Sequence, residues 1–426
     1  MPLREAPARW AADSFRALRH RNFRLFWLGQ LVSLTGTWMQ SVAQGWLMYR
    51  LTSSPLLLGV LGFTQFVPVV FFSLWAGVIA DRVDKRRMIL ITQSLCMVQA
   101  AVLALLTSLH VVQPWMVLVL AFAFGTINAF DLPARQSFLV EMVDKEDLTN
   151  AIALNSSAFN MARIVGPAIA GILVAMIGEA GCFWVNALSY VAVIWSLWVM
   201  RIEHPRHEPS TRHPWLVLRE GVRYAWSTRP IRNLLLLLGF MAGFGFQFMV
   251  LLPVYARDIL HLGPQAYGLL VSAFGLGSLL SALRLTSRHD RWGLRRNLLV
   301  GLLVAAIGMG GFALSRHLAL SLAAALAAGF GLIFYVASTN TLIQLTTEDR
   351  YRGRVMSFYT LMFIGTAPLG SLTVGAIAQH ASAPAATAFS AVVLLLGALW
   401  IAYRLRVIAA RESAAPPSEP APDVVH

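Results

Sequence analysis

Long apolar stretches follow one another along almost the whole chain. An α-helix needs about 18 or more mostly apolar residues to cross a hydrocarbon layer roughly 30 Å thick. The sequence contains twelve such stretches and therefore predicts twelve membrane-spanning helices. They lie near residues 24–50, 56–80, 88–109, 114–136, 149–177, 180–200, 232–256, 264–286, 297–315, 318–341, 352–378 and 384–404. They lack the alternation of apolar and polar residues that strands of a membrane barrel need, so we expect an all-α integral membrane protein.

The charged residues between these stretches give the orientation. If the twelve spans alternate in direction, 30 of the 34 lysines and arginines fall on one side, together with both termini. Arg50, Arg257 and Arg316 fall on the other side, and Arg163 lies inside a span. Basic residues are retained on the cytoplasmic side of a membrane. We therefore expect a multi-pass protein of the bacterial cytoplasmic (inner) membrane with both termini in the cytoplasm.

Composition excludes several classes of protein. With 57% hydrophobic and 13% charged residues, the chain is too apolar for a soluble protein. The net charge of +14 does not indicate a nucleic-acid partner, because no compact basic domain carries it. The first 22 residues carry five arginines and no apolar stretch, so we expect no cleavable signal peptide. Cys96 and Cys182 fall in different spans at different depths, which predicts neither a disulfide nor a metal site, and no motif indicates a cofactor.

The chain contains an internal repeat. A shift of 209 residues superposes Gly59 on Gly268, and it superposes Asp81 and Arg82 on Asp290 and Arg291. Six helices are thus duplicated in parallel orientation, which predicts two pseudo-symmetric six-helix bundles around a central pathway. The expected parts are a cytoplasmic N-terminal arm at 1–22, bundles at 23–200 and 232–406, a cytoplasmic linker with a helix on the membrane surface at 201–231, and a disordered tail at 407–426.

The residues GVIADRVDKRR after the second span, with a degenerate copy after the eighth, resemble the loop motif of the major facilitator superfamily. The similarity extends from about Phe23 to Arg404. Within the superfamily, the stretches NFRLFWLGQLVSLTGTWMQ, DLPARQSFLVEMV and RIVGPAIAG resemble bacterial exporters related to the enterobactin exporter. The chain departs from the family pattern at Asp84, where the superfamily usually has glycine, and at Thr286, where the second copy lacks the leading glycine.

The resemblance implies a conformational role for the repeated motif. Gly77 permits the close approach of a helix, and Asp81 would face the N-terminus of the eleventh span, where the helix dipole attracts an anion. This contact between the halves would hold the cytoplasmic side shut. The gating residues expected from the motif, its copy and the basic residues alongside are Gly77, Asp81, Arg82, Asp290, Arg291, Arg352 and Arg354. Asp131 and Arg135, four residues apart near the end of the fourth span, share one helical face and are expected to join them through Arg82.

The fifth span resembles the family's antiporter signature. It has Gly166, Pro167 and Gly171 at the motif positions, but Ala162 and Ala170 replace two glycines. Small residues permit close helix packing, and proline bends a helix. This motif has two possible interpretations: it serves only for helix packing, or it has a specific role in sealing an exporter.

Polar side chains within the spans are costly in a membrane and usually face a cavity or another helix. The candidates for substrate binding are Gln40, Gln44, Asn128, Asn160, Arg163, Gln247 and the aromatic Tyr335. Arg163 lies near the middle of its span, and no acid is expected at that depth. Three interpretations stay open for its charge: binding of an anionic group on the substrate, hydrogen bonds to the carbonyls freed by Pro167 and to Asn160 and Asn128, or exposure to lipid.

These features predict a secondary transporter rather than an enzyme, since no nucleophile–base set, metal motif or nucleotide-binding loop occurs. We expect a monomer that exports a small amphiphilic or anionic molecule, siderophore-like or drug-like, by alternating access coupled to an ion gradient. Protons are a candidate coupling ion, although no acid lies in the middle of a predicted span. An uptake permease or a lipid transporter of the same fold is the alternative.

The orientation can be tested by cysteine labelling in a chain whose Cys96 and Cys182 are replaced by serine. A cysteine at Ser53 should react with a membrane-impermeant maleimide from outside the cell, because the loop after the first span is expected outside. A cysteine at Ser210 should react only after the membrane is permeabilised. Labelling of Ser210→Cys in intact cells would overturn the topology.

Overall fold

The structure, a computed structural model, describes residues 15–201, 214–284 and 291–414. Every regular element in these residues is helical, which confirms the all-α fold. The first half contains η1 (Arg16–Arg19), α2 (Arg21–Thr52), α3 (Pro55–Arg82), α4 (Lys85–Ser108), α5 (Pro114–Phe138), η2 (Leu139–Glu141) and α6 (Leu148–Val199). The linker forms α7 (Pro214–Ser227). The second half contains α8 (Arg229–Gly245), η3 (Phe246–Leu251), α9 (Leu252–Val254), η4 (Tyr255–Ile259), α10 (Pro264–Arg284), α11 (Arg291–Leu314), α12 (Leu318–Thr346), α13 (Asp349–Gly365), α14 (Ala367–His380) and α15 (Ala383–Ala414).

These helices account for the twelve expected spans. In the described residues, ten helical segments are long and apolar enough to cross a membrane. One of them, α6, carries two spans joined by a kink at Gly178. The φ angle there is 73°, a left-handed conformation that glycine adopts more easily than other residues. The remaining span is α2, 32 residues long, which is less apolar because it buries Gln30, Ser33, Gln40 and Gln44.

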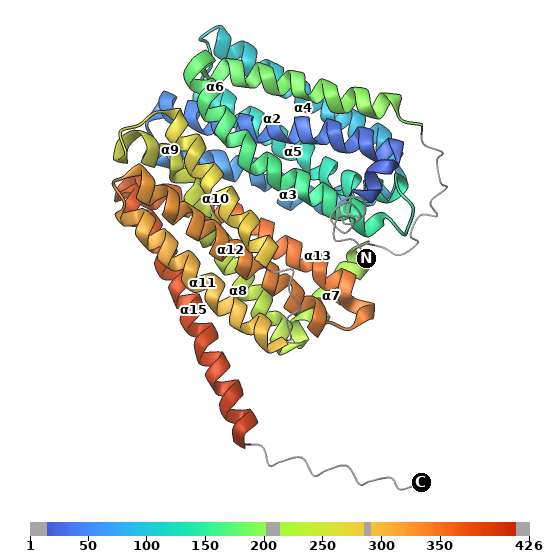
Figure 1. Cartoon of the computed structure of the whole chain (residues 1–426), viewed down its shortest axis with the longest axis vertical. Coiled ribbons are helices and arrows are strands. Elements are labelled where there is room, and N and C mark those ends of the chain that lie inside the picture. Colours follow the sequence, from blue (N-terminus) through green and yellow to red (C-terminus); the bar gives the residue numbers. More distant parts are fainter. Residues whose placement is uncertain (1–14, 202–213, 285–290, 415–426) are drawn as a thin grey trace, which may run out of the picture.

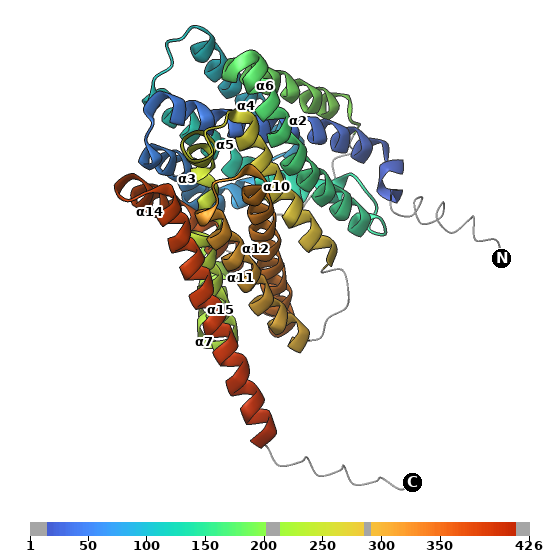
Figure 2. The same cartoon turned by 60° about the vertical axis from the view of Figure 1, so that its left-hand side comes forward.

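The helices form two groups that follow the sequence repeat. In the first half α2 packs along α6 and α3 along α5, and in the second half α11 packs along α12 and α15. Figures 1 and 2 show the first group in blue to green and the second in yellow-green to red, with α6 and α10 lying where the groups meet. The contacts between the halves are made mainly by α6 with α10 and by α3 with α14. These two helix pairs are equivalent in the repeat, because α3 corresponds to α10 and the first span of α6 corresponds to the span that contains α14.

Both crossings between the halves depend on glycine. A Cβ atom at Gly268 of α10 would lie 2.3 Å from the carbonyl oxygen of Pro167 in α6. A Cβ atom at Gly59 of α3 would lie 2.5 Å from the carbonyl oxygen of Ser371 in α14. Gly59 and Gly268 are equivalent positions of the repeat, so each half supplies one glycine that lets a helix of the other half approach backbone to backbone.

We call the end of the molecule that carries the start of α2, the α3–α4 turn and α7 the basic end, and the end at the α2–α3 turn the opposite end. Polar contacts join the halves at the opposite end. The Tyr49 hydroxyl donates to the Asp258 carboxylate, and Arg257 Nη1 donates to Ser53 Oγ over 3.2 Å. Ser54 Oγ donates to Gln379 Oε1 over 2.9 Å. The opposite end is therefore closed by side chains as well as by backbone.

The basic end lacks the helix approach expected at Gly77. A Cβ atom added there would meet nothing within 4 Å. The side chains of Asp81 and Arg291 and the whole of Asp290 lie outside the described residues. The latch expected between the second and eleventh spans is thus not engaged at Gly77, and it stays a prediction for the state in which the basic end is closed.

The linker helix has a specific partner in the second half. The expected helix is present as α7, and it packs against α13. The rings of Tyr224 and Tyr351 stack with centroids 4.1 Å apart, and Arg354 pairs with Glu220 at 2.7 Å. At the other end of the chain α15 continues to Ala414, so the helix extends into the stretch from residue 407 that we expected as a tail, and residues 415–426 lie outside the described residues.

The glycine crossings predict how closure can be disturbed. Gly268→Leu should push α10 away from α6 and destabilise the closed opposite end, because overpacking typically costs about 1–3 kcal/mol. In a chain without native cysteines, Ser54→Cys and Gln379→Cys should cross-link readily, and Gly268→Leu should reduce the yield severalfold. Gly310→Leu is the matched control, since a Cβ atom there meets nothing within 4 Å. Equal yields in both leucine variants would contradict the role of the crossing.

Candidate functional site

A cavity of about 870 Å³ lies between the two halves. It reaches Gly45, Pro253 and Tyr267 toward the opposite end, and Phe26 and Ala282 near the basic end. Phe26 is close to the start of α2 and Ala282 is close to the end of α10, so the cavity runs through much of the thickness of the bundle. Because the halves are joined at the opposite end, access to the cavity is from the basic end.

The wall contributed by the first half, which we call the polar wall, carries most of the cavity's polar groups, among apolar side chains such as Trp38, Phe66 and Phe159. Hydroxyl, amide and guanidinium groups from α2 to α6 line it, namely Gln30, Ser33, Thr37, Ser41, Gln65, Gln93, Asn128, Arg135, Gln136, Asn155, Ser156, Asn160, Arg163 and Tyr190. Arg135 and Arg163 are the charged members, and none of the described residues that line the cavity is Asp or Glu. This wall is therefore rich in hydrogen-bonding groups and basic.

The wall contributed by the second half is mainly apolar. Its residues are Phe246, Gln247, Met249, Val250, Pro253, Tyr267, Val271, Ala282 and Ile333. Most of them come from the seventh span, where the α-helix ends at Gly245 and continues as the 3₁₀ segment η3 and the π-helical segment η4. Broken helices of this kind often line the sites of transporters. The cavity thus has a mainly apolar wall from the second half, and its polar groups are concentrated on the wall from the first half.

Arg163 lies on the polar wall, one turn before Pro167. Its Nη2 donates to Asn160 Oδ1 over 2.9 Å, and its Nε is buried without a hydrogen-bond partner in the described structure. The side chain is partly exposed and lines the cavity, so it points neither to lipid nor into a closed packing site. Its positive charge therefore faces the cavity, and the hydrogen-bond partner that the structure describes for it, the side chain of Asn160, is an uncharged amide.

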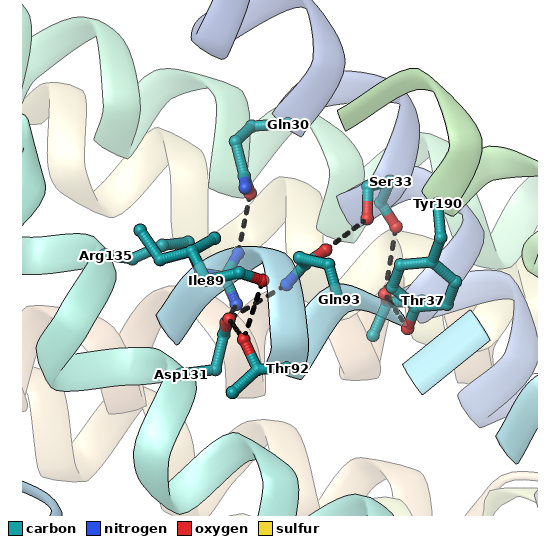
Figure 3. A network of polar contacts seen from close by, with 9 residues as sticks. All are labelled: Gln30, Ser33, Thr37, Ile89, Thr92, Gln93, Asp131, Arg135 and Tyr190. Carbon is teal, nitrogen blue, oxygen red and sulfur yellow. Dashed lines mark hydrogen bonds and ion pairs between the residues drawn. The ribbon is translucent and has the colours of Figure 1, made fainter. Parts of the chain in front are cut away.

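The second arginine of the cavity, Arg135, belongs to a buried polar network, which is shown in Figure 3. Asp131 of α5 is fully buried and forms an ion pair with Arg135 on the next turn. Thr92 Oγ1 donates to Asp131 over 2.6 Å, and Gln93 Nε2 donates over 3.0 Å. Arg135 Nη1 donates to Gln30 Oε1 of α2 over 2.6 Å, so the network joins α2, α4 and α5.

Gln93 continues the network toward α6. Ser33 Oγ donates to Gln93 Oε1 over 3.4 Å, and the hydroxyls of Thr37 and Tyr190 lie 3.1 Å apart. Thr37 also donates to the carbonyl of Ser33 over 2.9 Å (Figure 3). The polar wall is therefore held by bonds among four helices of the first half.

The expected substrate-binding residues fall into two groups. Asn128, Asn160, Arg163 and Gln247 line the cavity. Gln40, Gln44 and Tyr335 are buried and do not line it.

Gln40 lies in a further set of hydrogen bonds between helices of the first half. Gln40 Nε2 donates to Gln99 Oε1 over 2.9 Å, and Asn186 Nδ2 donates to Gln40 Oε1 over 2.7 Å. Tyr335 packs in the core of the second half, where a Cβ atom at Gly301 would lie 2.7 Å from its backbone nitrogen. Depth along a span was thus a poor guide to which face of the helix meets the cavity.

Other cavity residues were missed. Ser33, Thr37 and Ser41 line the cavity on one face of α2 at a spacing of four residues, and Gln30 and Gln93 lie beside them. The four-residue spacing of hydroxyls was visible in the sequence. In many helices, however, a serine or threonine hydroxyl simply donates a hydrogen bond to the backbone carbonyl one turn earlier. The spacing alone therefore does not show whether such hydroxyls line a cavity or lie in helix packing.

The expected gating residues are dispersed in the structure. Arg82 is exposed, Arg352 pairs with Asp349 at 2.5 Å, and Arg354 pairs with Glu220 of α7. Asp131 and Arg135 belong to the cavity network described above, in which their contacts come from α2, α4 and α5. The expectation that Arg82 joins them is not met in this state.

The two glycines of the fifth-span motif have different partners. A Cβ atom at Gly166 would lie 2.7 Å from Trp38 Cβ of α2, within the first half. A Cβ atom at Gly171 would lie 2.8 Å from the carbonyl oxygen of Pro264 at the start of α10. Part of the motif therefore packs the first half, and part contributes to the crossing that closes the opposite end.

Known proteins resemble this chain over nearly its full length. It is 26% identical over 82% of its length to the staphyloferrin A transporter of Staphylococcus aureus, covering 87% of that protein. It is 27% identical over 86% of its length to the multidrug efflux pump Tap of Mycolicibacterium fortuitum, covering 92% of that pump.

Solved structures support the fold. The nucleoside transporter NupG superposes with a TM-score of 0.70 at 12% identity, over 91% of this chain and 99% of that one. A bacterial homologue of the human lysosomal transporter Spinster, in an inward-facing and unoccupied conformation, also gives 0.70 at 15% identity, over 94% and 99%.

The family model of transmembrane secretion effectors matches residues 12–425. This match covers all twelve spans and both halves of the repeat. The chain belongs to this family of the major facilitator superfamily and is a multi-pass membrane transporter.

Proposed function

We propose that the protein exports small amphiphilic molecules that carry an acidic group. The observation that carries this proposal is the cavity lining, in which an unneutralised arginine, Arg163, lies among the polar groups of the first half and the wall from the second half is mainly apolar. A guanidinium binds carboxylates and phosphates through charge-assisted hydrogen bonds. The apolar wall around Phe246 and Val250 suits the hydrocarbon or aromatic body of the same molecule.

The direction of transport rests on the orientation of the chain. We place the basic end in the cytoplasm of a bacterial cell, because basic loops are retained there. The cavity of this structure would then be open to the cytoplasm and closed to the outside. Loading of substrate from the cytoplasm is the first step of export, and the relatives named as efflux pumps support the same direction.

The transport cycle follows from the two ends of the bundle. In alternating access, closure of the basic end around Asp81 and α13 would accompany opening at the glycine crossings. The chain has no nucleotide-binding loop, so an ion gradient is the energy source that we propose, with protons as the candidate ion. We propose a monomer as the transporting unit, because a single chain encloses the cavity.

The proposal can be tested in everted membrane vesicles, in which export appears as uptake. Two fluorescent dyes, 1-pyrenebutyrate with one carboxylate and its neutral amide, would be offered with a pH gradient and after collapse of that gradient by nigericin. Uptake of the acidic dye that is faster than in vesicles without the protein, and that is lost when the gradient collapses, would support acidic-substrate export. Uptake independent of the protein for both dyes would contradict it.

Arg163 is the residue on which the acidic preference should depend. Arg163→Gln removes one charge-assisted interaction, worth about 1.5–3 kcal/mol, and should reduce transport of the acidic dye by about ten- to a hundredfold while sparing a neutral one. Arg163→Lys keeps the positive charge and should therefore retain part of the preference for the acidic dye over the neutral one. Arg316→Gln is the matched control, since Arg316 does not line the cavity. Equal losses for both dyes with a lower protein yield would assign Arg163 to structure alone.

Asp81 tests the proposed closure of the basic end. A charge at a helix N-terminus is worth about 0.3–2 kcal/mol, so Asp81→Asn should favour the state open at the basic end by up to roughly thirtyfold and slow turnover. The cross-link between Ser54→Cys and Gln379→Cys should then form at least as readily as before.

Asp84→Asn is the matched control for Asp81→Asn. It makes the same change of charge in the same loop, and asparagine preserves the N-cap that Asp84 provides by accepting from the Arg87 amide over 3.1 Å. The latch would be excluded if both variants slowed transport alike, because a general effect of the loop charge would then suffice.

A further inference from the structure

The cavity contains two guanidinium groups, but only one of them is neutralised by the protein. We propose that Asp131 determines substrate specificity by masking Arg135, so that the cavity accepts molecules with one acidic group and discriminates against those with two. This inference rests on the proposed function, since it concerns the same cavity. Asp131 does not touch the cavity itself and acts through Arg135.

The position of Asp131 makes it a fixed counter-ion. Its side chain is 0% exposed, whereas that of Arg135 is 19% exposed and lines the cavity. Thr92 and Gln93 of α4 donate to the carboxylate, and Arg135, which lines the cavity, forms an ion pair with it. A carboxylate held by three donors on two helices cannot turn toward a substrate without breaking all of these bonds.

Arg135 has the geometry of an anion-binding group that is already occupied. One nitrogen of its guanidinium contacts Asp131, and another donates to Gln30 Oε1. Arg135 Nε and Gln30 Nε2 are buried and have no hydrogen-bond partner in the described structure. Both of these donors are too buried for a ligand to reach. While Arg135 stays paired with Asp131, its charge is therefore not available to a second acidic group on a ligand.

The charge of the cavity follows from this pairing. Among the described residues that line it, Arg163 provides one uncompensated positive charge, and the charge of Arg135 is cancelled by Asp131. One acidic group on a substrate gives a neutral loaded cavity. A second acidic group would lose its hydration against an ion pair that has no net charge, which is unfavourable in a buried site.

A structural role of Asp131 makes a different prediction. If Asp131 only joins α5 to α4, its neutralisation should weaken the fold and reduce the binding of all ligands together. If it masks Arg135, its neutralisation should improve the binding of a doubly acidic ligand in particular. The ratio of two affinities therefore separates the roles.

The test uses purified full-length protein in lipid nanodiscs and two probes of similar shape, 2-naphthoate with one carboxylate and naphthalene-2,6-dicarboxylate with two. Titration calorimetry would measure binding of each, with 2-naphthamide as the neutral reference. Asp131→Asn should strengthen binding of the dicarboxylate by on the order of tenfold or more relative to the monocarboxylate, because it frees one charged donor. The double variant Asp131→Asn with Arg135→Gln should lose this gain.

Several outcomes would overturn the inference. An unchanged affinity ratio in Asp131→Asn, absence of dicarboxylate binding in that variant, or a gain that survives Arg135→Gln would each do so. If Asp131→Asn fails to fold, as judged by thermal unfolding, Asp131→Ser removes the same charge and carries the same test. A failure of the proposed function looks different, because the unaltered protein and its Arg163→Gln variant would then bind 2-naphthoate no better than 2-naphthamide.

Discussion

The close approach of backbone to backbone at the two crossings between the halves is the constraint on which the rest of this structure depends. At Gly268 and Gly59 there is no space for a side chain, so α10 meets α6 and α3 meets α14 at separations that only glycine permits at these positions. These contacts hold the opposite end shut, and polar bonds such as that of Ser54 to Gln379 add to them. The cavity is what remains between the halves toward the basic end.

The repeat explains why two crossings form together. Gly59 and Gly268 occupy equivalent places in the two halves, so the same local packing is used twice, once in each direction across the interface. Such an interface suits a protein with two packed arrangements, since opening one end and closing the other exchanges one set of backbone contacts for another.

The halves have the same fold but give the cavity different chemistry. The first half supplies a network of amides, hydroxyls and arginines, in which Asp131 compensates Arg135 inside the protein. The second half supplies the irregular segment around Phe246 to Pro253, which is mainly apolar. Charges buried in a low-dielectric region are stable only when they are paired or hydrogen-bonded. The polar groups are therefore concentrated in one half, where they bond to one another across four helices.

The sequence by itself determined the all-α membrane fold, the twelve spans and the duplication, because apolar length and the spacing of a repeated motif are local properties of a chain. It also indicated Asn128, Asn160, Arg163 and Gln247 as cavity residues, since polar groups within a span must find a polar environment. It did not separate them from Gln40, Gln44 and Tyr335, which are buried in helix packing. Only the tertiary structure decided that Arg135 faces the cavity while Asp131 lies behind it, and that η3 breaks the seventh span. Those features depend on which faces of distant helices meet, and that depends on packing between the helices rather than on the hydropathy of any one of them.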